Sequence, residues 1–230
     1  MRIMCIGDLH LPFQHKHAFD FLEWMKEEYS PDVVVQIGDL VDIHSPSRHD
    51  ADPDGHSPGR EYDIARHLIK TFFKMFPEGY LCEGNHDLRY KRAAYRAQIP
   101  KDLVKTVQEA YSFPEKWEVA DNFVLDDVVY QHSPICGGDY AYFNAAKNNM
   151  RSTVSGHLHT KFGVIYFANR DKIVFGAATG CLIDKDAYAM QYAKQMREKP
   201  ILGSLIIDEG AMVTPVPMLL NKEGDWVGGK

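Results

Sequence analysis

The sequence lacks the features that mark several common classes of protein. No apolar run within its 230 residues approaches the length needed to span a bilayer, so no membrane partner is expected. Internal repeats, low-complexity tracts and linkers are also missing, which argues against repeat and disordered architectures. The length suits one large α/β domain or two small ones, with a sizeable core, and we expect a single domain over residues 1–230 as the simplest count.

Excess positive charge is also missing. The chain has 26 Lys and Arg against 32 Asp and Glu, which gives a formal net charge of −6 at pH 7. A protein that holds long nucleic acid by its phosphates usually presents a basic face. The nearest approach to a basic cluster is Arg89, Lys91, Arg92 and Arg96. The charge therefore disfavours a nucleic-acid partner, although it leaves room for a local basic groove.

Cysteine is scarce and irregularly spaced. Cys5, Cys82, Cys136 and Cys181 form no CxxC pair, so we interpret them as buried free thiols in a reducing compartment. The first residues, MRIMCIGDLH, resemble a β-strand more than a signal peptide, because no small-residue cleavage site follows the apolar run. These features predict a cytoplasmic protein.

The first half of the chain alternates two kinds of apolar pattern. Short apolar runs at 2–7, 33–37 and 80–82 predict strands, and the continuous run at 33–37 is typical of a strand buried on both faces. Between them, residues 18–29 and 61–76 carry apolar side chains at helical spacing. This order of strands and helices predicts an α/β domain with right-handed crossovers.

The second half is mostly short strands with hairpin turns between them. Two packed sheets with helices outside would accommodate both halves. Turns are predicted at Asp126-Asp127, at 169–171 and at 208–210. One long polar segment, residues 43–60, is typical of a functional loop, and we expect it to line the mouth of a site. The predicted strands are 123–125, 128–130, 153–155, 163–168, 172–175, 203–207 and 211–216.

Three strands of the first half end in side chains that bind metals. Asp8 and His10 follow the first strand, Asp39 follows the second, and Asn85 and His86 follow the third. Residues two apart in an extended segment point to the same side, and ligands bind beyond the carboxyl ends of strands in open α/β sheets. The DxH and GD motifs are weak signals alone. GNHD is more specific, because Asn supplies a neutral oxygen ligand and His an acid–base group.

The second half adds three histidines. His132 follows the strand at 128–130, and alone it would be interpreted as an ordinary buried histidine. His157 and His159 stand in a GHLH motif after another strand, which is typical of a metal site. The mixed oxygen and nitrogen donors suit Mn, Fe, Zn or Ni better than Mg or Ca.

Taken together, DxH, GD, GNHD, a lone His and GHxH resemble the signature of the calcineurin-like metallophosphoesterase superfamily. The motifs extend from Asp8 to His159. The resemblance implies a four-layer α/β/β/α sandwich, in which two mixed sheets are flanked by helices. It also implies a metal-dependent phosphoesterase with two divalent ions, Mn first and Fe, Zn or Ni as alternatives. The two ions would bind a phosphate ester and share a hydroxide that attacks phosphorus.

The resemblance assigns roles residue by residue. His86 would protonate the leaving group or stabilise charge on the phosphoryl oxygens, and Asp87 would orient His86. Asp87 could also cap the helix that follows it. Arg89 would bind the substrate phosphate, unless it is a solvated helix residue. We expect further substrate contacts from Asn85, His44 and His56. The implied metal ligands are Asp8, His10 and His159 for one ion, Asn85, His132 and His157 for the other, and Asp39 for both.

The favoured substrate is a nucleotide-type or small phosphodiester. The motifs GDLVDIH and GNHD differ from the GDxVDRG and GNHE of the Ser/Thr phosphoprotein phosphatases. They are closer to the phosphodiesterase and DNA nuclease branches, but the segment after His159 is short for the extra capping segment of those nucleases. A DNA nuclease is therefore the second hypothesis. A protein phosphatase or a non-catalytic metal-bound module follows, although no ligand position is missing here.

Overall fold

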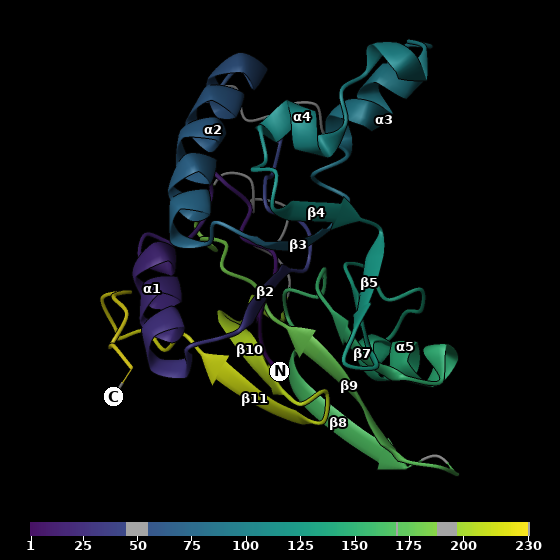
Figure 1. Ribbon diagram of the computed structural model, residues 1–230. Helices are drawn as coiled ribbons and strands as arrows, with labels where there is room; N and C mark the ends of the chain where they lie inside the picture. Colours follow the sequence, from purple (N-terminus) through teal and green to yellow (C-terminus); the bar gives the residue numbers. More distant parts are fainter. Residues whose placement is uncertain (45–54, 169, 188–196, 230) are drawn as a thin grey trace.

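The computed structural model describes residues 1–44, 55–168, 170–187 and 197–229. Two mixed β-sheets lie face to face, and helices cover their outer faces (Figure 1). The first sheet has the strand order β11-β10-β1-β2-β3-β4, and the second has the order β5-β6-β7-β9-β8. The four-layer α/β/β/α sandwich that the resemblance implies is therefore confirmed.

Each sheet has parallel strands in its middle. In the first sheet β1, β2, β3 and β4 are parallel, and β10 and β11 add antiparallel strands at one edge. In the second sheet β6, β7 and β9 are parallel, and β5 and β8 form the antiparallel edges. The first-sheet strands are β1 (Arg2–Ile6), β2 (Val33–Gln36), β3 (Gly79–Cys82), β4 (Trp117–Ala120), β10 (Gly203–Asp208) and β11 (Met212–Pro217). The second-sheet strands are β5 (Asn122–Leu125), β6 (Val128–Gln131), β7 (Ser152–Ser155), β8 (Phe162–Ala168) and β9 (Ile173–Thr179).

The helices lie in the connections between neighbouring parallel strands. α1 (Ala18–Tyr29) and α2 (Pro58–Met75) pack on the outer face of the first sheet. α3 (Arg89–Arg96), the short 3-10 helix η1 (Lys101–Leu103) and α4 (Val107–Tyr111) connect β3 to β4. α5 (Ala141–Asn149) packs against β7 and β9 of the second sheet.

The alternation of side chains along β1 explains the layering. Met4 and Ile6 point outward and join the helical core, which includes Phe21 and Phe72. Ile3, one position away, points to the opposite face and joins the core between the two sheets. β1 thus has two apolar faces, as a continuous apolar run predicts for a strand covered on both sides.

Most of the predicted elements are present. The helix at 18–29 is confirmed, and the second helix begins earlier, at Pro58, because the Ser57 side chain accepts a hydrogen bond from the Arg60 N–H. The predicted polar loop 43–60 therefore ends in a helical turn, and its residues 45–54 lie outside the described ones. The hairpin turns at 126–127 and 208–210 are confirmed. The turn at 169–171 includes residue 169, which is also not described.

The four cysteines form no disulfide, as predicted. Cys5, Cys82 and Cys181 are buried, whereas Cys136 is only half-buried, so the prediction of burial fails there. Among the described residues, no helix is both long and apolar enough to cross a membrane.

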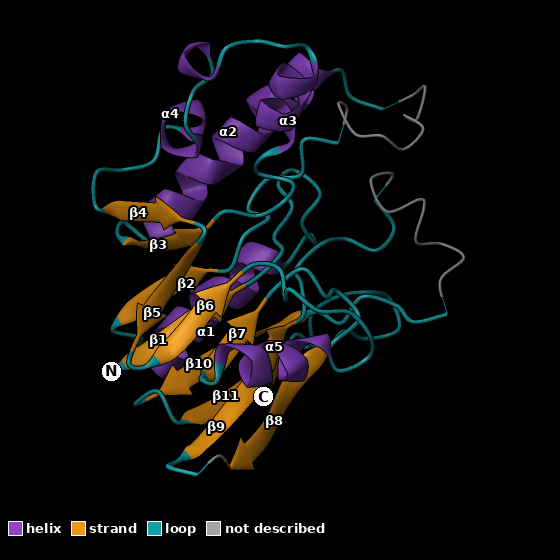
Figure 2. Ribbon diagram, turned by 90° about the vertical axis from the view of Figure 1, so that its right-hand side faces the viewer, coloured by secondary structure: helices purple, strands orange, loops and turns teal. Residues whose placement is uncertain are grey.

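The carboxyl ends of the parallel strands lie together at one side of the molecule. β1, β2 and β3 of the first sheet and β6 and β7 of the second run toward the same side of the molecule, where their loops gather (Figure 2). The two sheets therefore bring segments from both halves of the sequence to one place.

Candidate metal centre

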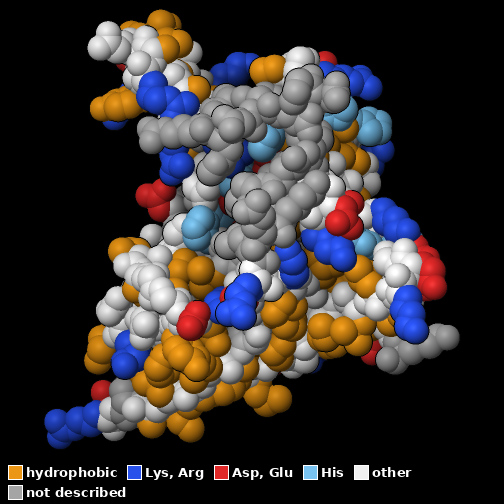
Figure 3. All heavy atoms as spheres, turned by 180° about the vertical axis from the view of Figure 1, so that it is seen from behind, with side chains coloured by type: hydrophobic (Ala, Val, Ile, Leu, Met, Phe, Trp, Pro, Cys, Tyr) orange, Lys and Arg blue, Asp and Glu red, His pale blue; other side chains and the backbone are white. Residues whose placement is uncertain are grey.

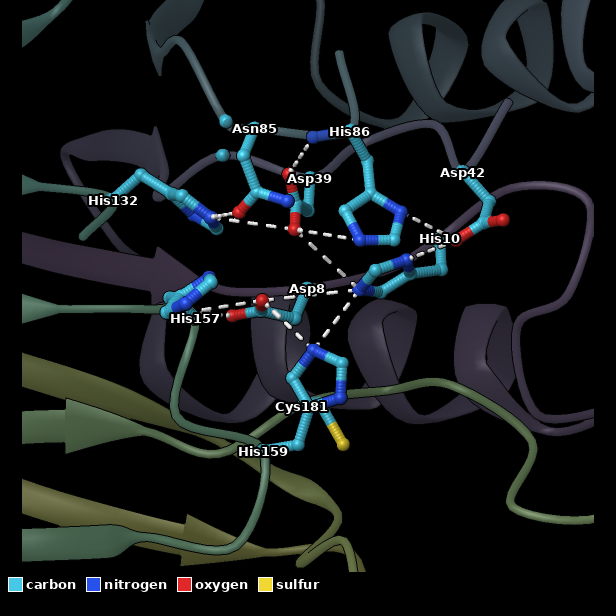
Figure 4. A network of polar contacts seen from close by, with 12 residues as sticks. Asp8, His10, Asp39, Asp42, Asn85, His86, His132, His157, His159 and Cys181 are labelled. Atoms are coloured by element: carbon cyan, nitrogen blue, oxygen red, sulfur yellow. Dashed lines mark hydrogen bonds and ion pairs between the residues drawn. The ribbon is translucent and has the colours of Figure 1, made fainter. Parts of the chain in front are cut away.

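The polar residues that follow these five strands converge on one point (Figure 4). In the space-filling view from behind, some histidine side chains are visible at the surface in the middle of the molecule (Figure 3). The converging residues are Asp8 and His10 after β1, Asp39 after β2, Asn85 after β3, His132 after β6, and His157 and His159 after β7.

One group of ligand atoms belongs to Asp8, His10, Asp39 and His159, and these atoms lie within 4.8 Å of one another. The Nε2 atoms of His10 and His159 are 3.0 Å apart. His159 Nε2 also lies 3.1 Å from Asp8 Oδ1. Except for His159, these residues are buried, so solvent water does not screen the charges of their side chains.

A second group belongs to Asp39, His132 and His157. His132 Nε2 lies 3.3 Å from Asp39 Oδ2 and 2.9 Å from the side-chain oxygen of Asn85. The rings of His132 and His157 meet edge to face, with their centroids 5.1 Å apart. Asp39 is the member that the two groups share.

Hydrogen bonds at the outer nitrogens show that this donor set fits metal ions. His10 Nδ1 lies 2.7 Å from Asp42 Oδ1, and His132 Nδ1 lies 2.8 Å from the carbonyl oxygen of Ile37. Both acceptors hold a proton on Nδ1, so Nε2 of each ring faces the centre and becomes the ligand atom once it has given up its own proton. Imidazole nitrogens and carboxylate oxygens that converge on one point are the arrangement that a divalent cation satisfies.

The charges of the site agree with this interpretation. Burial acts to lower the pKa of His10, but hydrogen bonds to Asp42 and Asp8 outweigh it and raise the pKa to about 10. Burial likewise opposes the charge of His132, but Asp39 raises its pKa to about 9. For Asp39 the desolvation that favours the neutral acid is outweighed by the neighbouring histidines, so its pKa falls well below the ordinary value. The centre therefore stabilises positive charge.

The backbone of the centre is strained. Asp8, His10, Asp39 and His157 have φ angles of 48°, 52°, 52° and 65°, in the left-handed region that costs about 1–3 kcal/mol for such residues. Strained residues persist where the surrounding contacts hold them. Here the backbone N–H of His157 donates to Asp8 Oδ2 at 2.9 Å, and that of His86 donates to Asp39 Oδ1 at 2.7 Å.

Two glycines permit the close approach of the loops. A Cβ on Gly84 would lie 2.1 Å from the backbone nitrogen of Asp39, and a Cβ on Gly156 would lie 2.8 Å from Asp8 Oδ2. Any side chain at either position would displace a candidate ligand. The glycines of the GNHD and GHLH motifs are thus explained by packing against Asp39 and Asp8.

Asp42 is a site residue that the sequence analysis missed. Its Oδ1 lies 2.7 Å from His10 Nδ1 and 2.6 Å from His86 Nδ1, so one carboxylate oxygen accepts from two imidazoles. Burial favours the neutral acid, but the hydrogen bonds from His10 and His86 hold the pKa of Asp42 far below its ordinary value. The signal was present, since Asp42 closes the GDLVD motif three residues after Asp39.

Asp87 does not orient His86 and does not cap α3, contrary to both interpretations of the sequence. Its carboxylate accepts hydrogen bonds from the backbone N–H groups of Asp39, Val41 and Gly84, at 2.9, 3.0 and 2.9 Å. α3 has Leu88 at its N-cap and no side-chain cap. Burial and then the charge of Asp39 raise the pKa of Asp87 to about 7. Asp87 thus ties the loop after β2 to the loop after β3.

Arg89 is neither solvated nor free to meet a phosphate in this structure. Its Nη1 donates to the carbonyl oxygen and carboxylate of Asp42 at 3.0 and 3.2 Å, and its Nη2 lies 2.9 Å from His86 Nε2. Because a guanidinium can only donate, Nε2 of His86 accepts and its proton sits on Nδ1, against Asp42. His86 Nε2 is also 3.8 Å from Asp39 Oδ2, at the edge of the centre.

The two loop histidines lie in different surroundings. His44 is buried, its Nδ1 lies 3.7 Å from Asp42 Oδ2, and its ring meets that of Phe13 edge to face. His56 is exposed and directly precedes the N-cap of α2. The structure therefore brings His44 to the Asp42 side of the centre and leaves His56 at the surface.

The comparisons with known proteins identify the family. The family model for calcineurin-like phosphoesterases matches residues 1–161, which include every candidate ligand, and the chain belongs to this family of hydrolytic enzymes. No curated protein matches the chain.

Solved structures match the chain at low sequence identity. Vps29 from Chaetomium thermophilum is 12% identical with a TM-score of 0.50, over 98% of this chain and 91% of that one. A metallophosphoesterase from Sphaerobacter thermophilus is 17% identical with a TM-score of 0.49, over 95% and 89%. YfcE, a phosphoesterase from E. coli, is 12% identical with a TM-score of 0.46, over 99% and 97%.

Proposed function

We propose that this phosphoesterase uses two divalent metal ions to hydrolyse a nucleotide-type or other small phosphodiester. The observation that carries the proposal is the pair of ligand groups that share Asp39. We assign Mn²⁺ first, with Fe, Zn or Ni as alternatives that suit the same donors. The protein is proposed to act as a single cytoplasmic domain. Its ligands are Asp8, His10 and His159 for one ion, Asn85, His132 and His157 for the other, and Asp39 for both.

When bound, the two ions would supply Lewis acidity toward the phosphate and lower the pKa of a coordinated water. The residues of the chain prepare the place where this chemistry occurs. Asp42 and the carbonyl of Ile37 hold the rings of His10 and His132 with Nε2 inward. Asp87 fixes the loops that carry Asp39 and Asn85 through their backbone N–H groups.

His86 is the proposed proton donor to the leaving oxygen. In the structure its Nε2 accepts from Arg89, so donation requires Nε2 to take up a proton and Arg89 to move away. Asp42, at 2.6 Å from Nδ1, would stabilise the resulting imidazolium. Once released from His86, the Nη2 group of Arg89 is the donor that we propose for binding the substrate phosphate, while Nη1 stays bound to Asp42.

The test combines metal removal with a generic diester. Chelation should abolish hydrolysis of bis-p-nitrophenyl phosphate, and Mn²⁺ should restore it. His132→Ala should inactivate the enzyme, whereas His67→Ala, a matched change at an exposed histidine of α2, should not. A panel of cyclic nucleotides, dinucleotides, DNA and phosphopeptides would then identify the substrate class. Activity that survives full metal removal, or that is confined to phosphopeptides, would refute the proposal.

A further inference from the structure

A hollow of about 340 Å³ adjoins the candidate metal centre. Three segments form its walls: the start of α3, the corner where the chain passes from β4 in the first sheet to β5 in the second, and the segment after β6. Asn85 and His132 line its inner end, and they belong to the proposed second metal position. The hollow is of the size that ligand pockets have, and through Asn85 and His132 it borders the proposed metal centre.

Four polar side chains of the hollow have no partner among the described residues. Arg92, Asp121, Asn122 and Ser133 are exposed, and no hydrogen bond or ion pair joins their side chains to any part of the chain that the structure describes. Other polar residues of the wall are already engaged. Glu83 pairs with Lys91 at 3.1 Å, and the Gln131 side chain donates to the Ser133 carbonyl at 3.1 Å. A guanidinium, a carboxylate, an amide and a hydroxyl thus remain for a ligand.

The wall of the hollow also contains apolar side chains. Leu88 and Ile135 also line the hollow, and Ile135 is 90% exposed although it is a large hydrophobic residue. The wall carries both Arg92 and the acids Glu83 and Asp121, so it is not a site for a second phosphate. A flat ring with hydrogen-bonding edges and apolar faces complements this mixture, and nucleobases have that character.

We propose that the hollow binds the nucleoside part of the substrate. Arg92, Asp121 and Asn122 would hydrogen-bond to the base or sugar, and Leu88 and Ile135 would contact the faces of the ring. The inference rests on the proposed function, because it requires the scissile phosphate to lie at the metal centre beside Asn85 and His132. The proposal goes beyond that function by naming the residues that would determine the enzyme's preference among diesters.

Chromogenic diesters with the same leaving group, with and without a nucleoside, test the proposal. Bis-p-nitrophenyl phosphate has no nucleoside, whereas the 5′- and 3′-p-nitrophenyl esters of thymidine phosphate place one beside the same scissile bond. Wild-type enzyme should favour at least one thymidine ester. Arg92→Ala should lower its kcat/KM on the order of tenfold, the value of a hydrogen bond to a charged group, and Asn122→Ala by roughly 2–10-fold, the value of a hydrogen bond between neutral groups, both mainly through KM. The rate on bis-p-nitrophenyl phosphate should change less than about twofold, since no bond to the hollow is lost.

Arg96→Ala is the matched control, because Arg96 is an exposed arginine one helical turn along α3 that does not line the hollow. Equal losses for Arg92→Ala and Arg96→Ala, or equal losses on both substrates, would overturn the proposal. So would a wild-type enzyme with no preference for either thymidine ester.

Binding separates this inference from the proposed function. Thymidine monophosphate should bind the Mn²⁺-loaded protein more tightly than inorganic phosphate, and Arg92→Ala should remove that difference. If no diester is hydrolysed but this pattern of binding is found, the proposed reaction fails and the nucleoside subsite stands. If diesters are hydrolysed and thymidine monophosphate binds no better than phosphate, the subsite fails alone.

Discussion

At the scale of single residues, Asp42 contacts both a proposed metal ligand and the proposed proton donor, two roles that the sequence analysis treated separately. One of its oxygens accepts from His10, a proposed metal ligand, and from His86, the proposed acid. Arg89 and His44 approach its other oxygen. Its carboxylate therefore positions a ligand and a proton donor through the same atom.

Asp42→Asn should damage both functions at once. The amide keeps the shape of the carboxylate but not its charge, so Mn²⁺ affinity and kcat should each fall by about 10–100-fold, as for other groups that orient metal ligands. Isothermal titration with Mn²⁺ and steady-state kinetics on bis-p-nitrophenyl phosphate would measure the two effects. Asp102→Asn, at an exposed aspartate of η1, is the control. Unchanged metal affinity in Asp42→Asn would show that this carboxylate does not support His10.

His86→Ala should separate proton donation from metal binding. A nitrophenolate leaves without a proton, whereas an alkoxide needs one, so the variant should lose on the order of 10²–10⁴-fold on an alkyl ester and clearly less on a nitrophenyl ester. The measurements are kcat/KM on both esters and the metal content of the variant. Equal losses with metals retained would mean that His86 stabilises phosphoryl charge, and a fall in metal content would place it among the ligands.

The sequence was informative about side chains that follow strands within a motif. Asp8, Asp39 and His132 converge as expected, although their binding of metal stays a prediction. The partners of Asp42 and Asp87 could not be predicted, because they depend on how the loops after β1, β2 and β3 meet. A motif identifies the residues of one loop but does not describe the contact between two loops.

At the scale of elements, the loop after β3 packs against the loop after β2 with no space between them. Gly84→Ala should therefore displace Asp39, lower the free energy of unfolding by about 1–3 kcal/mol or more, and weaken metal binding. Gly59→Ala is the matched control, since a Cβ there meets nothing within 4 Å and Gly59 lies in α2. It should be neutral or stabilise by up to about 1 kcal/mol. Denaturant unfolding measures the stability of both variants, and titration with Mn²⁺ measures their metal affinity. Equal stability and equal affinity in the two variants would contradict the packing explanation.

Elements with a strong apolar pattern were predictable, and elements with a weak one were not. α1 has large apolar residues at helical spacing and begins and ends where predicted. α5 buries only the small side chains Ala141, Ala145 and Ala146, so its sequence gives little helical periodicity. β4 was missed because WEVA is short and carries an exposed Glu118, and only its pairing with β3 defines it.

At the scale of the whole molecule, the two sheets bring buried carboxylates and histidines from both halves of the chain together. The pKa values of His10 and His132 are about 10 and about 9, above the ordinary value of 6.5. Both rings are therefore protonated at pH 7 in the metal-free protein. A divalent ion needs the neutral rings, so metal binding must displace their protons.

Mn²⁺ affinity should therefore rise with pH between about 6 and 9, with release of about two protons per chain at pH 7. Calorimetric titrations in buffers of different ionisation enthalpy measure the number released. His132→Asn should reduce it by about one, because it removes one of the two rings that titrate. Metal binding without proton release would contradict the assignment of these histidines as ligands.

The central proposal is a centre of two ions that share Asp39, and the metal stoichiometry of matched variants tests it most directly. Wild-type protein loaded with Mn²⁺ and freed of excess ion should hold two ions per chain by elemental analysis. His159→Ala and His157→Ala, one from each ligand group, should each retain one. Asp39→Ala should lose tight binding of both, and Asp63→Ala, at an exposed aspartate of α2, should keep two. One ion per wild-type chain, or two ions in Asp39→Ala, would contradict the dinuclear centre.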